Sequence, residues 1–274
     1  MSRTGAGPGR APAILATLVV LILAGSGCRQ QQAPGPTAPP QATGGADPAR
    51  IRVLVFTRTA AFRHRSISDG VAAIRRLGRD HGFAVDDSAD PARIGQGLAG
   101  YRAVVFLSTT GDLLDPGQQA ALRRYLQGGG GWVGVHAAAD AEYDWPWYGR
   151  LVGTWFRRHP PVQRATVRPV LGAAALAGKL PARWERTDEW YDFAADPRGR
   201  VRVLAAVDES TYTGGGMGTG HPIAWCHEYD GGRAWYTAMG HTSESFREPR
   251  FLAHLLAGIR YATGLTPTRC DPSP

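Results

Sequence analysis

Continuous apolar runs and helix-like periodicities alternate along residues 50–135. Strands buried on both faces are expected at the uninterrupted apolar segments, with a shorter strand after the first helix: Arg50–Thr57, Phe83–Asp87, Ala103–Ser108 and Gly131–Val135. Helices are expected between them: Ser68–His81 with Ser68 as N-cap, Pro91–Leu98, and a helix capped by Asp115 that ends near Gln127. Strict alternation of strand and helix predicts an α/β fold with a parallel sheet and right-handed crossovers.

The pattern after residue 140 is less regular. It predicts two helices and four strands: Trp145–Val152, Ala165–Val170, Val201–Val207, Ile223–Tyr229, Arg233–Met239 and Pro249–Ala262. An aromatic-rich irregular stretch separates the first two of these strands. Gly214–Gly220 lacks the lysine and the strand-to-helix context of a phosphate loop, so we interpret it as a turn or lid. The folded domain is expected to cover residues 50–264, followed by a tail at 265–274.

The first 49 residues have the composition of an export signal and a linker. Arg3 and Arg10 precede an apolar segment, Ala13–Ala24, which is too short for a comfortable membrane span. Small residues then lead to Cys28, as at a bacterial lipoprotein cleavage site. Residues 1–27 are thus expected to be a lipoprotein signal peptide and 28–49 a disordered tether, with the domain lipid-anchored through Cys28 in the cell envelope; an ordinary secretory signal is the alternative.

Charge and cysteine usage exclude some classes of function. The formal net charge is +8, but the cations are almost all arginine and no basic face or run stands out, so a nucleic-acid partner is not expected. No C-x-x-C spacing supports a thiolate zinc site. Cys226 and Cys270 could pair in an oxidising compartment, and the sequence leaves this open.

The segment GGGGWVGVHAAAD, residues 128–140, carries the clearest chemical signal. A buried strand stops at His136 among small residues, which is the arrangement of a nucleophile elbow. An imidazole in that place disfavours covalent acyl chemistry and leaves metal ligation, proton transfer or sugar binding. A hydrogen-bonded turn histidine is the plainer alternative.

Other polar segments follow the ends of predicted strands, where open α/β sheets bind ligands: Thr57–Ile67, Ser108–Gly111 and Gly240–Glu244. The acidic pair Asp188 and Glu189 lies in the irregular stretch and could fold back over them. We expect these groups to meet at one sheet edge. Taken singly, His64 could be a solvated loop residue, and the tryptophans could belong to the core.

Several longer pieces of the chain resemble the ThuA-like (trehalose utilisation) domain, in the order of that family: FTRTAAFRHRSI, GGGGWVGVHAAAD, LVGTWFRRHPP, RTDEWYDF, HPIAWCHEYDGGRAWYTAMGHTSESF and FLAHLLAGIRYATG. The resemblance implies a flavodoxin-like, class I glutamine amidotransferase-like three-layer sandwich with a mostly parallel sheet. It also implies that His136 replaces the elbow cysteine of the amidotransferases, that His241 and Glu244 stand near the place of their triad partners, and that the protein acts in carbohydrate metabolism.

Two functional hypotheses follow. In the first, the protein is an enzyme acting on a sugar or oxidised sugar, in which His136, His241 and Glu189 are catalytic and hold a divalent metal such as zinc. Substrate-binding residues would be Arg63, His64, Thr109, Trp190 and Tyr191. In the second, the domain is a non-catalytic, surface-tethered carbohydrate-binding module. A true amidotransferase needs an activated thiolate, and Cys226 lies within a strand. The sugar, the reaction and the oligomeric state are not specified by the sequence.

Overall fold

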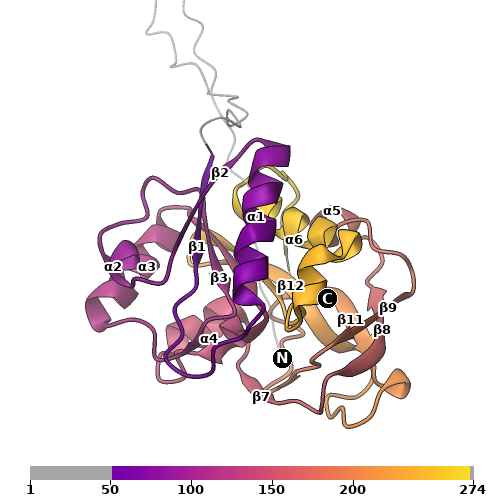
Figure 1. The fold of residues 1–274 in the computed structure, drawn as a ribbon. Coiled ribbons are helices and arrows are strands. Elements are labelled where there is room, and N and C mark those ends of the chain that lie inside the picture. Colours follow the sequence, from indigo (N-terminus) through magenta and orange to yellow (C-terminus); the bar gives the residue numbers. More distant parts are fainter. Residues whose placement is uncertain (1–50, 272–274) are drawn as a thin grey trace, which may run out of the picture. The chain divides into compact units, whose positions relative to one another are not determined.

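Nine strands form one mixed sheet in the order β2-β1-β3-β5-β13-β12-β11-β8-β9 (Figure 1). The structure is a computed structural model and describes residues 51–271. The strands of this sheet are β1 (Arg52–Phe56), β2 (Ala84–Ser88), β3 (Ala103–Leu107), β5 (Gly131–Val135), β8 (Gln163–Pro169), β9 (Trp184–Asp188), β11 (Arg202–Asp208), β12 (His221–Tyr229) and β13 (Gly232–Thr237).

The five strands from β2 to β13 are parallel to one another. Every residue of β3 and β5 is buried, which explains why their sequences are continuously apolar rather than alternating. These strands lie within one or two residues of the predicted ranges. Their carboxyl ends meet at one edge of the sheet, as the alternating pattern predicts.

The other four strands, β12, β11, β8 and β9, pair antiparallel. The expectation of a mostly parallel sheet therefore holds for the side of the sheet from β2 to β13, while a four-stranded antiparallel extension completes it. Strand β9 was not predicted, because it lies in the aromatic-rich stretch that was interpreted as irregular. It alternates buried and exposed residues and ends at the acidic motif Asp188–Glu189.

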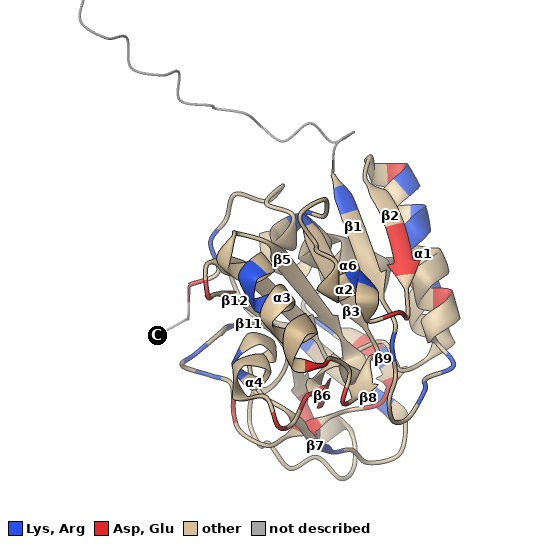
Figure 2. Ribbon diagram, turned by 90° about the vertical axis from the view of Figure 1, so that its left-hand side faces the viewer, with Lys and Arg blue, Asp and Glu red and all other residues tan. Residues whose placement is uncertain are grey.

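Helices cover both faces of the sheet, giving three layers. Figures 1 and 2 show α1 and α6 on one face and α3 and α4 on the other. The helices are α1 (Ile67–His81), α2 (Ala92–Gly95), α3 (Pro116–Gln127), α4 (Pro146–Val152), α5 (Ala174–Ala177) and α6 (Pro249–Ala262). Helix α3 begins with the expected Asp115 cap, closed as a capping box by Gln118.

The predicted cap of α1 is wrong. The N-cap residue is Ser66, and the hydroxyl of Ser68 donates to the Arg65 carbonyl instead. Ser66 makes no cap hydrogen bond either, because its hydroxyl donates to the carbonyl of Gly240, 3.2 Å away. That long-range contact ties the start of α1 to the loop after β13.

Two short ribbons lie beyond the carboxyl edge of the parallel strands. One pairs β4 (Thr110–Gly111) with β6 (Asp140–Ala141), and the other pairs β7 (Phe156–Arg158) with β10 (Asp192–Phe193). Figure 2 shows acidic positions near β6 and β7, at the end of the domain opposite the start of β1. The ribbons hold the loops of this edge in place.

The tail after α6 is fastened to the sheet. Cys270 forms a disulfide with Cys226 of β12, with 5.8 Å between their Cα atoms, so the pairing that the sequence left open is made. None of the helices between residues 51 and 271 combines the length and the apolar character that crossing a bilayer requires. The predicted signal peptide, the tether and Cys28 lie outside the described residues.

Candidate metal and sugar site

Four side chains of the types that bind metals converge beyond the carboxyl edge of the sheet. His64 follows β1, His136 follows β5, His241 follows β13, and Glu189 follows β9. One ligand atom from each residue lies within 4.8 Å of those of the other three. We call these four residues the histidine cluster. The predicted meeting of His136, His241 and Glu189 is found in the structure, with His64 added to the group.

His136 is held in one tautomer. Its Nδ1 lies 2.7 Å from the carbonyl oxygen of Ala238, so Nδ1 carries the proton and donates it. The lone pair of Nε2 therefore faces the cluster. The residue is fully buried and has a φ of 51°, in the left-handed region that few side chains adopt. This strained turn, directly after β5, is the elbow-like position that the sequence indicates.

Three ligand atoms form a nearly equilateral triangle. His136 Nε2 lies 3.2 Å from His241 Nδ1 and 3.3 Å from Glu189 Oε2, and the remaining edge is 3.2 Å. A tetrahedral zinc with bonds of about 2.0–2.1 Å requires its ligands to be about 3.3 Å apart. The triangle thus has the dimensions of one face of such a site, before any ion is added.

The backbone around His241 is fixed by the buried carboxylate of Asp188. Its oxygens accept hydrogen bonds from the amides of Gly240 and His241, at 2.9 and 3.0 Å, and Arg186 pairs with the same carboxylate. Gly240 has a φ of 115°, and a Cβ there would lie 3.1 Å from the side chain of Val135. A glycine is therefore required for the turn that delivers His241.

His64 closes one side of the cluster. Its ring stands nearly perpendicular to the rings of His136 and His241, with centroids 4.7 and 5.1 Å away. Its Nδ1 is buried and has no hydrogen-bond partner among the described residues. Burial and the neighbouring imidazoles lower the pKa of His64 to about 3, so the ring is neutral at physiological pH. A neutral ring is the form that can bind a metal.

Glu189 and His241 shift each other's pKa toward the charged form. Burial acts to raise the pKa of Glu189, but the adjacent imidazoles of His136 and His241 outweigh this and lower the pKa. Accepting a hydrogen bond from His241, the Glu189 carboxylate raises the pKa of His241 in return. The carboxylate is therefore ionised, as a metal ligand must be.

A cavity of about 250 Å³ opens onto the cluster. Its lining residues are Phe62, His64, Asp140, Phe156, His159, Glu189, Tyr191 and His241. The hydroxyl of Tyr191 lies 3.2 Å from His136 Nε2, and His159 Nδ1 lies 3.2 Å from the second oxygen of Glu189. The two ribbons, one of which contains Phe156, bring together lining residues that lie far apart in the sequence.

Of the predicted substrate-binding residues, His64 and Tyr191 line this cavity. Arg63 is exposed and donates to the Thr57 carbonyl, and Thr109 is fully buried. Trp190 is buried, with its indole nitrogen donating to the carbonyl of Gln163. These three are not among the lining residues.

Sequence reasoning missed four of the lining residues: Phe62, Asp140, Phe156 and His159. Two of the four had a usable signal. Phe62 lies two residues before His64, and Asp140 ends the His-Ala-Ala-Ala-Asp segment, one short helical turn after His136. No such sequence signal marks Phe156 and His159, because their positions depend on the β7–β10 ribbon.

A second group of ligand-type residues lies nearby: Asp192, Glu209 and His221, which we call the loop cluster. Glu209 accepts hydrogen bonds from the amides of Met217 and Gly218, at 2.8 and 3.0 Å. Asp192 accepts from the amide of Gly216 and pairs with Arg158, while His221 Nε2 donates to the Tyr191 carbonyl. The cluster thus fastens the glycine loop to the domain.

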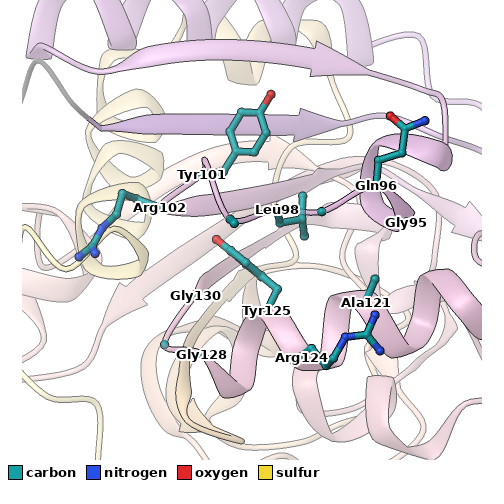
Figure 3. Close-up of a pocket in the computed structure, with 13 residues that line it drawn as sticks. Gly95, Gln96, Leu98, Tyr101, Arg102, Ala121, Arg124, Tyr125, Gly128 and Gly130 are labelled. Carbon is teal, nitrogen blue, oxygen red and sulfur yellow. The ribbon is translucent and has the colours of Figure 1, made fainter.

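A larger hollow, about 590 Å³, lies elsewhere, between α2, the start of β3 and the end of α3. Its walls are mostly glycine and alanine with two tyrosines. Figure 3 shows its arginine side chains, Arg102 and Arg124, pointing away from each other, so no cationic pair converges on a ligand. The smaller cavity, which opens onto the histidine cluster, therefore remains the candidate functional site.

The comparisons with known proteins agree with the fold. The model of the ThuA family, described as trehalose utilisation, matches residues 52–262, and the chain therefore belongs to this family. A ThuA-like protein from Bacteroides uniformis ATCC 8492 superposes with a TM-score of 0.65 at 23% identity, covering 82% of this chain and 95% of that one. One from Parabacteroides merdae ATCC 43184 has the same score at 22% identity, covering 81% and 97%.

A β-galactosidase from Bacillus circulans sp. alkalophilus is similar over 79% of this chain and 31% of its own, with a TM-score of 0.51 and 14% identity. At these identities the similarities to solved structures establish the fold alone. No curated protein matches the chain.

Proposed function

We propose that this ThuA-family protein is a divalent-metal enzyme acting on a sugar or an oxidised sugar, with the histidine cluster as its catalytic centre. Membership of the family connects the chain with trehalose or carbohydrate utilisation. The observation that carries the metal proposal is the triangle of His136 Nε2, His241 Nδ1 and Glu189 Oε2 around a single point, with the tautomer of His136 fixed.

Two imidazoles and one carboxylate are the donor set of many catalytic zinc sites, in which a further position is left for water or substrate. His64 stands beside that set with a neutral ring and a nitrogen that no described residue bonds to. A buried polar atom without a partner is costly, and ligation is one way to remove that cost. In this proposal His136, His241 and Glu189 hold the metal, and His64 closes the cluster on a fourth side.

A bound divalent metal would polarise an oxygen of the substrate as a Lewis acid. Tyr191 would act beside it: burial raises the pKa of its hydroxyl well above the ordinary value, so the group stays protonated and can donate a hydrogen bond. His159, held against Glu189, would orient that carboxylate from the cavity side.

The test is metal analysis of the purified untagged protein, with matched variants. We expect about one equivalent of a divalent metal in the wild type and in His254→Asn, which changes a buried histidine outside the cluster. His136→Ala should contain none. Absence of metal from the wild type after growth with added zinc, manganese or iron would overturn the proposal.

Product analysis then separates enzyme from binding module. Incubation of the metal-loaded protein with trehalose, simple glycosides and their keto derivatives should give a new product, identified by mass spectrometry and NMR, that His136→Ala does not form. Sugar binding without turnover would favour the carbohydrate-binding module instead.

We also propose that residues 1–27 are a lipoprotein signal and that Cys28 carries the lipid. The Cys226–Cys270 disulfide supports export, because such bonds form in oxidising compartments. Mass spectrometry of the mature N-terminal peptide tests this. A diacylated Cys28, absent from Cys28→Ser, is expected, whereas an unmodified N-terminus at another residue would overturn the assignment.

A further inference from the structure

We propose that the cavity above the histidine cluster is a subsite for a single pyranose ring, which stacks on Phe62 and donates a hydroxyl hydrogen bond to Asp140. This inference rests on the proposed function, because it names the class of ligand that would reach the cluster. Neither residue belongs to the cluster itself. In such a subsite the protein would recognise a single sugar ring, either a free monosaccharide or the terminal residue of a glycoside.

The size of the cavity carries the first step. Its volume of about 250 Å³ lies below the roughly 300–1,000 Å³ of sites that enclose drug-sized ligands. One six-membered sugar ring suits such a space, and a second ring would extend beyond it. The terminal residue of a glycoside, or a free monosaccharide, is therefore the best match.

Phe62 carries the second step. Its side chain is 64% exposed, although it lines the cavity. The backbone beneath it is fixed, because its carbonyl accepts a hydrogen bond from the Thr110 hydroxyl at 2.7 Å. The ring also packs nearly perpendicular to His64, with centroids 4.8 Å apart. An aromatic surface held open at the cavity is what the C–H face of a pyranose stacks on, since both are apolar.

Asp140 carries the third step. One oxygen of its carboxylate accepts the hydroxyl of Tyr143 at 2.7 Å, and Tyr143 also lies 3.1 Å from the carbonyl of Phe156. This network fixes the carboxylate in the cavity wall. Because a carboxylate has about four acceptor positions, Asp140 retains capacity for the hydroxyl groups of a sugar. The apolar surface of Phe62 matches the C–H face of a pyranose, and the anchored acceptor Asp140 matches its hydroxyl groups.

Isothermal titration of the full mature chain with methyl pyranosides of glucose, galactose, mannose and glucuronic acid tests the proposal. We expect at least one to bind with a dissociation constant below ~10 mM. Phe62→Ala and Asp140→Asn should each weaken that binding about tenfold, and Phe62→Trp should retain it. Trehalose or another disaccharide of the preferred sugar should bind within about threefold of the methyl glycoside.

Leu171→Ala and Asp144→Asn are the matched controls: one removes an exposed apolar side chain and the other an exposed carboxylate, and neither residue lines the cavity. Metal content, measured in the same samples, should stay at the wild-type level in all variants. Binding by none of the panel, or equal binding by Phe62→Ala and wild type, would overturn the subsite. Absence of metal with intact, Phe62-dependent sugar binding would overturn the metal centre and leave the subsite supported.

Discussion

The histidine cluster and the loop cluster contain the same kinds of side chain at the same close spacing, yet their atoms are used differently. In the loop cluster, carboxylates accept backbone amides of the glycine loop, and Asp192 pairs with Arg158. In the histidine cluster, one lone pair is forced toward the centre by the Ala238 carbonyl, and His64 Nδ1 has no hydrogen-bond partner within residues 51–271. Proximity of ligand-type residues is therefore not enough. What distinguishes a metal site is a ligand atom whose lone pair is not already used in a hydrogen bond within the protein.

The largest expected effect is on stability when metal is added. Free zinc at about 1,000 times its dissociation constant should raise the free energy of unfolding of the wild type by about 4 kcal/mol, because the metal binds only the folded cluster. Urea unfolding of chelator-treated protein with and without zinc measures it. Glu209→Gln, in the loop cluster, should gain as much as the wild type. Equal stabilisation of Glu189→Gln would remove the distinction between the clusters.

A direct comparison of the two glutamates should give the next largest effect. Glu189→Gln removes a charged ligand and should weaken zinc binding by about 100-fold or more, which exceeds the usual effect of outer partners. Glu209→Gln should leave the affinity unchanged. Competition against a chromophoric chelator measures both constants, and a similar loss in the two variants would mean that the loop cluster also takes part in binding.

The pH dependence of stability extends the comparison to another buried histidine, His254. His254 Nδ1 donates to the Ala177 carbonyl, no residue in the described part of the chain bonds to its Nε2, and the rings of Trp184, Trp235 and Phe251 pack around it. Burial lowers its pKa to about 4. Below pH 6.5 the unfolded chain takes up a proton that the folded chain does not, so stability is lost as the pH falls from about 6.5 toward 4.

Between pH 7 and pH 4.5 this loss should be about 2–3 kcal/mol. Replacing His254 by Asn, which retains a donor but does not titrate, should reduce the acid sensitivity of unfolding by that amount. Urea unfolding curves of both proteins at the two pH values give the difference. Parallel loss of stability in both would show that the ring is protonated without penalty.

The smallest effect concerns the structural role of the loop cluster. Glu209→Gln keeps an acceptor but loses its charge, so the hydrogen bonds from Met217 and Gly218 weaken and stability should fall by about 1 kcal/mol. Limited proteolysis should cut the loop at 214–220 faster in the variant. Unchanged cleavage would show that the loop is fixed by other contacts.

The sequence was sufficient for the parallel half of the sheet, because strands such as β3 and β5 are buried on both faces and therefore uniformly apolar. The rule that strand ends share an edge then brought His136 and His241 together. It could not predict the walls of the cavity. Asp140 and Phe156 lie on ribbons of two or three residues, too short for any periodicity, and their partners are distant in the sequence.

The left-handed backbone at position 136 has a consequence for laboratory evolution. When metal is removed, selection for heat tolerance no longer rewards metal binding by His136, and asparagine adopts this conformation more readily. Libraries screened by thermal challenge with a chelator present should therefore accumulate replacements at this residue and lose metal retention with them. A screen that combines both readouts would keep the imidazole.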